Sequence, residues 1–475
     1  MRVLAVGVTL LTIGSCAVAQ VADKGNPATD AYDGWHLAVQ AWSFNRFTLY
    51  EAIEKTSGLG VHWIEAYPGQ KLSAQTGDVG FDPKLSPQLR DQVKQNLKSH
   101  GVRLINYGVA SLPKDEKSCR EVFDFAKDMG IETIQAEPDE ASMEMLDKLC
   151  QEYKIGIGIH NHPKPAHYWN PDTVLAACKG RSPWIGACAD TGHWVRCGLD
   201  PLECLKKLEG RIRSTHFKDL NKFGDPNASH DVIWGTGVNK AMEALAVLDK
   251  QGYRGTFSIE YEANWENNVP EIAGCVAFFN KQAGELYASG WQPLLAQDLS
   301  NASFKADSWR LAQGVLERQG GGDLWTKARY GDFVLDVEFK VSKGANSGVF
   351  IRCGDLADWI NTTIEIQVHE TTDGTKHGQC GAVYDIISPS KDVTKPAGQW
   401  NTMQIIAKGP RLQVVMNGER IVNINLDDWT EAGKNPNGEP NKFKCAYKDM
   451  PRTGFIGFQD HGSYVAFRNI RIKNL

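Results

Sequence analysis

The sequence lacks several patterns that would place it in a familiar class. Its 11 cysteines form no Cys-x-x-Cys pair and no Cys/His finger spacing, so a structural zinc site is not expected. No run of lysine and arginine occurs, and 52 basic against 57 acidic residues give a net charge of −5. This balance argues against a nucleic-acid partner. No segment beyond the N-terminus is apolar for long enough to span a membrane, so no transmembrane segment is expected.

The N-terminus has the pattern of an export signal. Arg2 is followed by an apolar stretch over residues 3–13, and small residues stand at Ala17 and Ala19. This pattern predicts a secretory signal peptide over residues 1–19, removed after Ala19. An alternative is lipoprotein-type cleavage, which would leave a lipid anchor at Cys16. Either route predicts an exported protein, periplasmic or on the outer surface of a bacterium.

The length of 475 residues favours two domains. Over residues 35–288, eight short apolar runs alternate with helical stretches, several of which close on a glycine. Eight strand-helix units over roughly 250 residues are typical of a TIM (β/α)8 barrel. A doubly wound open sheet is the alternative, but no glycine-rich phosphate turn follows the first expected strand.

The second half has a different periodicity. Residues 289–302 resemble a linker, and from residue 303 to 475 apolar residues alternate with polar ones in several segments separated by turn signals, including Asn417-Gly418. Helical periodicity is almost absent. We therefore predict an all-β, two-sheet sandwich of jelly-roll type.

Four expected barrel strands end on metal-binding residue types. They are strands four, six, seven and eight, which carry Glu137, Asp190, His216 and Glu260. Because parallel barrel strands deliver their C-terminal ends to one rim, these side chains should converge. Such a set suits Mn²⁺, Mg²⁺, Co²⁺ or Zn²⁺. Alternatively each is a polar rim residue with no metal, but three crowded carboxylates would then repel one another.

Other rim residues are candidates for acid-base chemistry. His160 and His162 fall on one face of strand five, and a neutral imidazole is a suitable base near neutral pH. Lys218 could act as a base or hold an anionic oxygen, and Glu65, at the end of strand two, could act as a second base or bind hydroxyls. The alternatives are a His160 locked in the barrel wall and a Lys218 in a solvated ion pair.

Three further residues are candidate substrate contacts. His193 follows Asp190 closely, so its imidazole could contact either the substrate or a ligand carboxylate. Trp42 and Tyr67 could stack on a sugar ring, although aromatic residues near barrel ends are often simply packed.

The ordered motifs of the first half resemble a known family. They are IQAEP, HNH, ADTGH, HFKD and SIEYE. In this order they resemble the sugar phosphate isomerase/epimerase family of xylose-isomerase-like barrels. The resemblance implies a divalent ion held by Glu137, Asp190, His216 and Glu260, and proton transfer on a keto-sugar or inositol-like substrate.

The second half also resembles a known domain. Its motifs are ANSGVFIR, IEIQVHE, GAVYDI, KPAGQWNTMQIIAKGPRLQVVMNGERI and GFIGFQDHGSYVAFRNIRI. They resemble the 3-keto-disaccharide hydrolase domain, a concanavalin-like sandwich. Four polar positions in these motifs are candidate carbohydrate contacts: Arg352, Glu365, Gln367 and His461. At each, a strand residue hydrogen-bonded outside any binding site is the alternative.

Together the two resemblances predict a function. A ketone at C3 of a glycoside acidifies the C2 hydrogen, so a base can remove it and the aglycone can leave C1. We therefore expect an exported, metal-dependent lyase or hydrolase of 3-keto-glycosides, with His162 or Lys218 as the base. One alternative is a sugar isomerase or epimerase with a carbohydrate-binding sandwich. Another is a non-catalytic glycan-binding protein.

Overall fold

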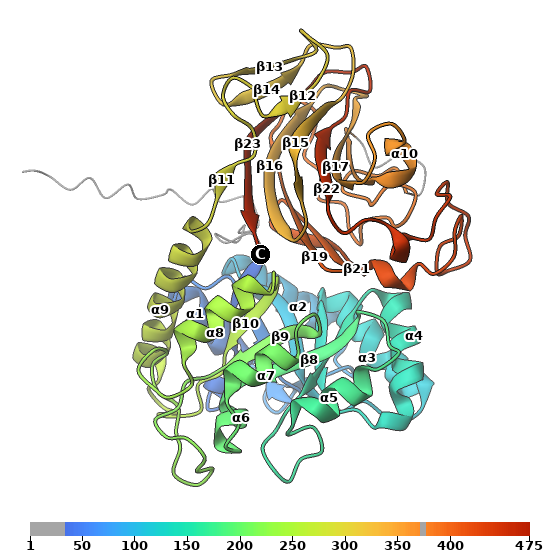
Figure 1. Cartoon of the computed structure of the whole chain (residues 1–475). Helices are drawn as coiled ribbons and strands as arrows, with labels where there is room; N and C mark the ends of the chain where they lie inside the picture. Colours follow the sequence, from blue (N-terminus) through green and yellow to red (C-terminus); the bar gives the residue numbers. More distant parts are fainter. Residues whose placement is uncertain (1–33, 371–376) are drawn as a thin grey trace, which may run out of the picture.

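The computed structural model describes residues 34–370 and 377–475 in two domains, a barrel and a β-sandwich. The expected signal peptide and Cys16 lie outside the described residues. Figure 1 shows the barrel in blue and green and the sandwich in yellow to red, with the C-terminus at their junction. No helix within the described ranges is both long and apolar enough to cross a bilayer.

The first domain is a closed barrel of eight parallel strands, as predicted. The strands are joined in the order β1-β10-β9-β8-β7-β6-β5-β2, and a small hairpin of β3 and β4 lies beside them. Each of the eight barrel strands matches one of the eight apolar runs. Their bounds are β1 (Trp35–Gln40), β2 (Trp63–Ala66), β3 (Gln70–Lys71), β4 (Gly80–Phe81), β5 (Arg103–Ala110), β6 (Thr133–Ala136), β7 (Gly156–His160), β8 (Ile185–Asp190), β9 (Ile212–Phe217) and β10 (Gly255–Ile259).

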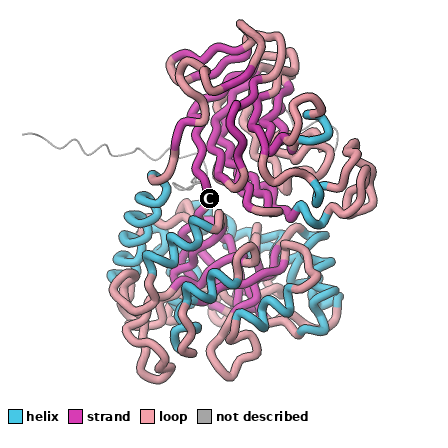
Figure 2. The backbone as a smooth tube through the Cα atoms, viewed as in Figure 1, coloured by secondary structure: helices cyan, strands magenta, loops and turns pink. Residues whose placement is uncertain are grey.

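Helices cover the outside of the barrel (Figure 2). Local signals set their ends: Thr48 and Glu51 form a capping box at α1, and α3 ends at Gly130, whose φ of 75° suits glycine. The bounds are α1 (Leu49–Gly58), α2 (Pro87–Ser99), α3 (Glu116–Met129), α4 (Met143–Tyr153), α5 (Pro171–Cys178), α6 (Thr191–Arg196), α7 (Pro201–Lys207), α8 (Ala241–Lys250) and α9 (Val269–Ala288), with short 3-10 turns η1 (Ala41–Phe44) and η2 (Glu140–Ser142).

The second domain is a sandwich of two antiparallel sheets, again as predicted. The larger sheet has the order β13-β14-β23-β16-β19-β20-β21 with β11 beside β23, and the smaller has the order β12-β15-β22-β17-β18. The bounds are β11 (Gln292–Pro293), β12 (Ala302–Ser303), β13 (Trp309–Ala312), β14 (Val315–Arg318), β15 (Leu324–Tyr330), β16 (Phe333–Val341), β17 (Asn346–Cys353), α10 (Trp359–Thr362), β18 (Ile364–His369), β19 (Asn401–Lys408), β20 (Arg411–Met416), β21 (Glu419–Asn425), η3 (Leu426–Asp428), η4 (Tyr447–Asp449), β22 (Gly454–Phe458) and β23 (Val465–Asn474).

The segment between the domains also builds the sandwich. Residues 289–302 include β11 and the first residue of β12, which pair with β23 and β15. Leu294, Leu295 and Leu299 from this segment are buried in the sandwich core. The sandwich is therefore anchored directly at the end of α9 rather than tethered by a free chain.

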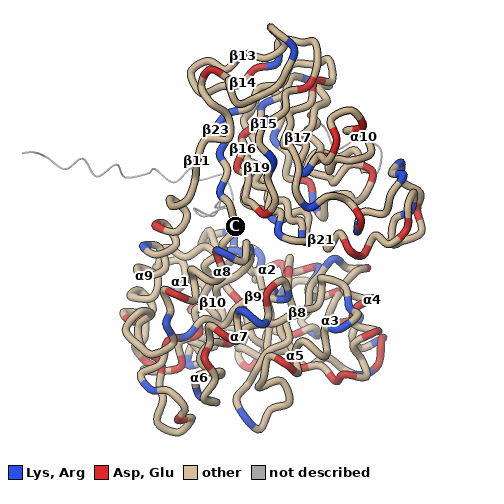
Figure 3. The backbone as a smooth tube through the Cα atoms, in the orientation of Figure 1, with Lys and Arg blue, Asp and Glu red and all other residues tan. Residues whose placement is uncertain are grey.

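The larger sheet of the sandwich packs on the N-terminal end of the barrel, where charged residues of both signs meet (Figure 3). Arg254, just before β10, donates to Gln404 of β19 at 2.6 Å, and Lys473 of β23 pairs with Asp249 at 2.6 Å. Arg103, at the start of β5, pairs with Glu419 of β21. Since these contacts lie at the starts of the barrel strands, the C-terminal ends of the strands face away from the sandwich.

Candidate functional site

Four buried side chains meet at the C-terminal end of the barrel. They are His160 at the end of β7, Asp190 at the end of β8, His216 in β9 and Glu260 just after β10. One nitrogen or oxygen atom of each lies within 4.8 Å of the corresponding atom of every other. The pairing of β8 with β9 sets Asp190 directly opposite His216, which explains why the two side chains share one level. Two imidazoles and two carboxylates form a set that can hold a divalent cation.

This group of four differs from the expected quartet in one residue. Glu137, which follows β6, is not among the four, and His160 is. The carboxylate of Glu137 instead pairs with Nδ1 of His162 and lies 3.6 Å from Nδ1 of His160. Burial opposes its ionisation, but the two imidazoles outweigh burial and lower the pKa of Glu137 to about 2. Glu137 is thus a charged partner of histidines beside the quartet.

Unsatisfied polar atoms mark this cluster as a ligand site. Both ring nitrogens of His160, Oδ2 of Asp190, Nδ1 of His216 and Oε2 of Glu260 are buried without a hydrogen bond to any described residue. Buried polar atoms normally have partners, because leaving one unpaired costs free energy. Some of these atoms are in charge contact without hydrogen-bond geometry: Glu260 Oε2 lies 3.0 Å from His216 Nδ1, and Asp190 Oδ2 lies 3.0 Å from Lys218 Nζ. A cation among the four residues would give one of these atoms from each residue a ligand bond.

Lys218 brings a positive charge into the cluster. Its Nζ lies 3.0 Å from Asp190 Oδ2 and 2.8 Å from both Glu260 Oε2 and Glu262 Oε2, but only the contact with Glu262 has hydrogen-bond geometry. Burial opposes the charge on Lys218, yet the carboxylates raise its pKa well above the ordinary value. Lys218 is therefore held as an ammonium ion.

The same charges keep the quartet carboxylates ionised. Burial would raise the pKa of Glu260, but Lys218 and His216 lower it well below its usual value. Burial likewise opposes the charge of Asp190, and His193 and Lys218 outweigh burial. Two ionised carboxylates at neutral pH are the state that a cation requires.

Glu65 orients His216 rather than facing a substrate. It is fully buried in β2, and Nε2 of His216 lies 2.7 Å from its Oε1. Ser258 and Asn106 donate to its other oxygen at 2.6 and 3.2 Å. A carboxylate that holds the outer nitrogen of a ligand histidine fixes the ring and leaves Nδ1 facing the cluster. The structure thus gives Glu65 a positioning role in place of the catalytic role expected from the sequence.

His193 lies against the same cluster. Asp190 caps α6 by accepting the His193 N–H at 2.7 Å, and the His193 Nε2 lies 3.5 Å from Asp190 Oδ2. Burial lowers the pKa of His193 well below its usual value, and Lys218 adds to this effect. Its imidazole is therefore neutral and available to contact a substrate hydroxyl or a ligand.

The mouth of the barrel carries exposed residues above the quartet. The side chain of His162 is 48% exposed, and it forms a second potential metal-binding trio with His160 and His193. Trp42 is 40% exposed, and its ring meets the ring of Tyr67 edge-on at 5.0 Å. The expected base His162 and the expected substrate contacts Trp42, Tyr67 and His193 therefore lie near the strand ends that carry the quartet.

Arg352 differs from its expected role in carbohydrate contact. It is 1% exposed, and its guanidinium donates to the carbonyls of Gly331 and Gly409 at 3.0 and 2.7 Å and to Asp332 at 3.0 Å. These bonds occupy all three of its nitrogens. Arg352 therefore ties strand ends together and is not available to a sugar.

Glu365 and Gln367 lie on the outer face of the smaller sheet, since Ile364, Ile366 and Val368 of the same strand point into the core. The carboxyl group of Glu365 lies directly over Gly348. A Cβ atom added to Gly348 would lie only 2.6 Å from Oε1 of Glu365. Burial, reinforced by a neighbouring acid, raises the pKa of Glu365 to about 7 although Lys442 opposes the shift.

Partly unsatisfied groups surround Glu365. Oε1 of Gln367 and Oε1 of Gln459 are buried without a hydrogen bond to any described residue. Asp323, also raised in pKa by burial, lies close enough for its charge to affect Glu365, and the exposed His461 acts on Asp323 in turn. This face is a second candidate site, whose two carboxyl groups form no ion pair with a cation of the described residues.

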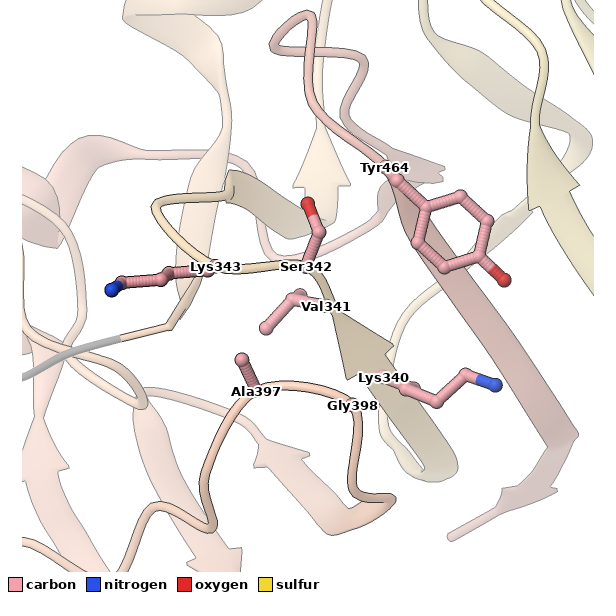
Figure 4. Close-up of a pocket in the computed structure, with 7 residues that line it drawn as sticks. All are labelled: Lys340, Val341, Ser342, Lys343, Ala397, Gly398 and Tyr464. Atoms are coloured by element: carbon pink, nitrogen blue, oxygen red, sulfur yellow. The ribbon is translucent and has the colours of Figure 1, made fainter.

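A shallow hollow on the sandwich is a weaker candidate. It has a volume of about 390 Å³ and is lined by Lys340, Ser342, Lys343 and Tyr464 with three small or apolar residues (Figure 4). No carboxylate or imidazole lines it, so it lacks the groups needed for acid-base or metal chemistry.

Sequence reasoning missed the role of two residues. Glu262 completes the carboxylate cage of Lys218, and Arg196 pairs with Glu262 at 2.8 Å and with Asp231 at 3.1 Å. Glu262 could have been inferred, because it stands two residues after Glu260 and alternate strand residues share a face. No sequence signal identified Arg196.

The first domain is a TIM barrel with a buried cluster of imidazoles and carboxylates, and the second is a β-sandwich. Comparisons with known proteins match one family to each of the two domains. The xylose isomerase-like TIM barrel matches residues 53–279, and the 3-keto-alpha-glucoside-1,2-lyase-like domain matches residues 274–473. The chain belongs to these two families, one in each half. Both matches place it among sugar-modifying enzymes.

Individual relatives cover one half each. A 3-keto-disaccharide hydrolase of Bacteroides thetaiotaomicron is 28% identical over 203 residues, 35% of this chain and 70% of the relative. An inosose dehydratase of Bacillus thuringiensis is 28% identical over 130 residues, 25% of this chain and 44% of the relative, so this chain spans less than half of that enzyme. The crystal structure of a putative glycosyl hydrolase from Parabacteroides distasonis is 35% identical, covering 39% of this chain and 99% of that one, with a TM-score of 0.38.

Proposed function

We propose that this chain is an exported, divalent-metal-dependent enzyme that acts on keto-sugars and cleaves 3-keto-glycosides by abstraction of the C2 proton. The observation that carries the proposal is the buried cluster of His160, Asp190, His216 and Glu260, in which one nitrogen or oxygen atom of each residue lies within 4.8 Å of those of the others. These four residues would hold the ion. A bound Mn²⁺, Mg²⁺, Co²⁺ or Zn²⁺ would stabilise negative charge that develops on the sugar oxygens next to the C3 ketone.

The chemistry needs one base and one leaving group. The base takes the C2 proton, the electron pair of the C2–H bond forms a C1–C2 double bond, and the C1–O bond breaks to release the aglycone. Addition of water across that double bond completes hydrolysis. Loss of the C2 proton is feasible because the adjacent ketone delocalises the charge.

His162 is the residue best placed to be the base. Its Nδ1 pairs with the carboxylate of Glu137, whose low pKa keeps it charged, and its side chain is exposed at the barrel mouth. This pairing leaves Nε2 to accept the proton at the substrate carbon, as in other carboxylate-oriented histidines. Lys218, the other candidate base, is held protonated by three carboxylates, so its role is to stabilise negative charge.

The relatives support elimination chemistry next to a carbonyl. A dehydratase acting on an inosose removes water, and a 3-keto-disaccharide hydrolase acts on an oxidised sugar. The proposed cleavage combines these two features: it is an elimination, as in the dehydratase, on an oxidised sugar, as in the hydrolase. The aglycone leaves C1 as an alkoxide, where a dehydratase would expel hydroxide.

The proposal is tested by incubating the purified chain with Mn²⁺ and 3-keto-trehalose and measuring released glucose. Wild-type protein should release glucose, and EDTA should stop the release. Glu260→Ala should lower the rate by about a thousandfold, the equivalent of several kcal/mol of charge stabilisation. The matched control is Glu266→Gln, which removes an 80% exposed carboxylate from the loop after β10 and should leave the rate unchanged.

The outer face of the sandwich is a second candidate for the cleavage. The specific observation is Glu365, whose raised pKa leaves part of it protonated at neutral pH and able to transfer protons without a metal. Cleavage that persists in Glu260→Ala and in EDTA but is lost in Glu365→Gln would assign the reaction to the sandwich and overturn the barrel proposal.

A further inference from the structure

A cavity of about 390 Å³, partly open to solvent, lies at the junction of the two domains. Its barrel side is formed by loops at the N-terminal ends of the strands, and its sandwich side by the turn from β19 to β20 and by β21. Four cationic side chains line it: Arg181, Arg211, Lys408 and Arg411. The cavity is thus at the end of the barrel opposite to the quartet, and no part of the proposed reaction uses it.

The acids that line the cavity leave these cations only partly neutralised. Glu209 is engaged by Lys408 at 2.5 Å, and Asp332 is engaged by Arg352 at 3.0 Å. Within the described ranges, no carboxylate lies within 4.0 Å of Arg411, whose Nε donates to the amide oxygen of Asn423 at 3.2 Å.

The third acid of the lining is Asp428. Burial raises its pKa, although Arg211 opposes the shift.

Two further arginines stand behind this lining. Arg213 is 6% exposed, its Nε has no hydrogen-bond partner in the described chain, and its NH1 donates to the carbonyl of Pro183, a lining residue, at 3.3 Å. Arg420, from β21, donates to the carbonyl of Arg254. Carbonyl partners satisfy hydrogen bonds but bring no negative charge.

The arginines therefore repel one another. Burial, with the charges of Arg420 and Arg411, lowers the pKa of Arg213 to about 9, and burial with Arg420 and Arg211 lowers the pKa of Arg411 to about 9. Glu132 offsets part of this repulsion at Arg213 and Arg420, and Glu209 offsets part of it at Arg411. Guanidinium groups that are buried and only partly neutralised are costly, and an anion between them lowers that cost.

We propose that this cavity binds a small oxyanion, a phosphate or sulfate group that is free or carried on a sugar, and that the bound anion strengthens the docking of the sandwich on the barrel. The planar guanidinium matches the oxygens of such a group with two parallel hydrogen bonds. Arg211 already donates to the carbonyls of Arg181, Ser182 and Ile185, whereas Nε of Arg181 is buried without a hydrogen bond to any described residue. Because Arg181 comes from the barrel and Arg411 from the sandwich, one anion contacts both domains.

Calorimetric titration of the full chain with inorganic phosphate tests the binding. Wild-type protein should show saturable binding, and Arg411→Gln should bind at least tenfold more weakly. The matched control is Lys473→Gln, which removes a positive charge from the same junction but outside the cavity, and should change the affinity less than twofold. Absence of saturable binding, or equal binding by wild type and Arg411→Gln, would overturn the proposal.

Thermal unfolding separates anion binding from a simple packing effect. In chloride buffer, Arg411→Gln should melt at a higher temperature than wild type, because one of the repelling charges is gone. Phosphate at equal ionic strength should raise the melting temperature of wild type and not that of Arg411→Gln. A wild-type response to phosphate no larger than to chloride would contradict the proposal.

The source of the anion is distinguished by a second titration, with glucose 6-phosphate and with glucose. Tenfold tighter binding of glucose 6-phosphate than of phosphate, without binding of glucose, would assign the cavity to a group carried on a sugar. Equal affinities would assign it to the free ion.

Discussion

Glu260 of the barrel and Glu365 of the sandwich are both nearly buried carboxyl groups, yet their ionisation is shifted in opposite directions. Lys218 and His216 hold the pKa of Glu260 well below its usual value, whereas burial with little compensating charge raises the pKa of Glu365 to about 7. Burial acts on both in the same direction. The difference comes from the cations beside them, which suits the barrel site to a metal ion and the sandwich site to metal-free proton transfer.

The ammonium group of Lys218 should be the largest contributor to this difference. Lys218→Met leaves Asp190 and Glu260 without their shared cation, so the metal-free protein should lose about 3 to 5 kcal/mol of unfolding free energy. Urea unfolding in EDTA measures the loss, and added Mn²⁺ should restore part of it. Lys94→Met, at the partly exposed Lys94–Asp128 pair, is the control and should cost less than about 1 kcal/mol. Equal losses in the two variants would show that Lys218 has no special role.

The sandwich carboxyl should show the opposite dependence on pH. The unfolded chain loses the Glu365 proton near pH 4.5, but the folded chain keeps it until about pH 7. Stability from this residue is therefore present below pH 4.5 and is lost as the pH rises to 7, by roughly 3 kcal/mol. Glu365→Gln should remove this loss, so the variant should gain stability over wild type between pH 5 and pH 8. If the unfolding free energies of wild type and Glu365→Gln changed with pH in the same way, the raised pKa of Glu365 would be refuted.

Loss of the contact between Glu65 and His216 should lower metal affinity less than loss of a ligand side chain would. Glu65→Gln removes the negative charge that holds Nε2 of His216, and metal affinity should fall about 10- to 100-fold. Competition with a fluorescent chelator measures the affinity. Glu140→Gln, at an exposed pair with His167, serves as the control and should bind metal as wild type does. Unchanged affinity in Glu65→Gln would leave the orientation of His216 to packing alone.

The aromatic residues at the mouth should have the smallest effect. Removing the half-exposed ring of Trp42 deprives a sugar of one stacking face, so Trp42→Ala should raise KM about 2- to 10-fold with little change in kcat. A fall in kcat with no change in KM would instead place Trp42 at the reacting atoms.

The sequence predicted the two folds because their periodicities are strong. The eight barrel strands are short apolar runs, and the sandwich strands alternate apolar and polar residues, as in Ile364–His369. Three of the four quartet residues were also identifiable, since Asp190, His216 and Glu260 stand at or beside strand ends.

The remaining features depend on geometry that the sequence does not encode locally. The register of β6 and β7 pairs Ala136 with Ile159, so Glu137 and His160 follow at the same level of the rim, and the local sequence does not indicate which of them joins the quartet. The pairing of Lys218 with three carboxylates follows from the closing of β8, β9 and β10 side by side. The docking of the sandwich rests on scattered contacts such as Arg254 with Gln404, which no motif indicates.

The most direct test of the account is the metal content of two variants after dialysis against Mn²⁺ and then against metal-free buffer. Wild-type protein should retain about one ion per chain, His160→Ala should retain none, and Glu137→Gln should retain nearly the wild-type amount. Retention by His160→Ala together with loss in Glu137→Gln would contradict the assignment of the quartet, and a wild-type protein that retains no ion would contradict the metal site itself.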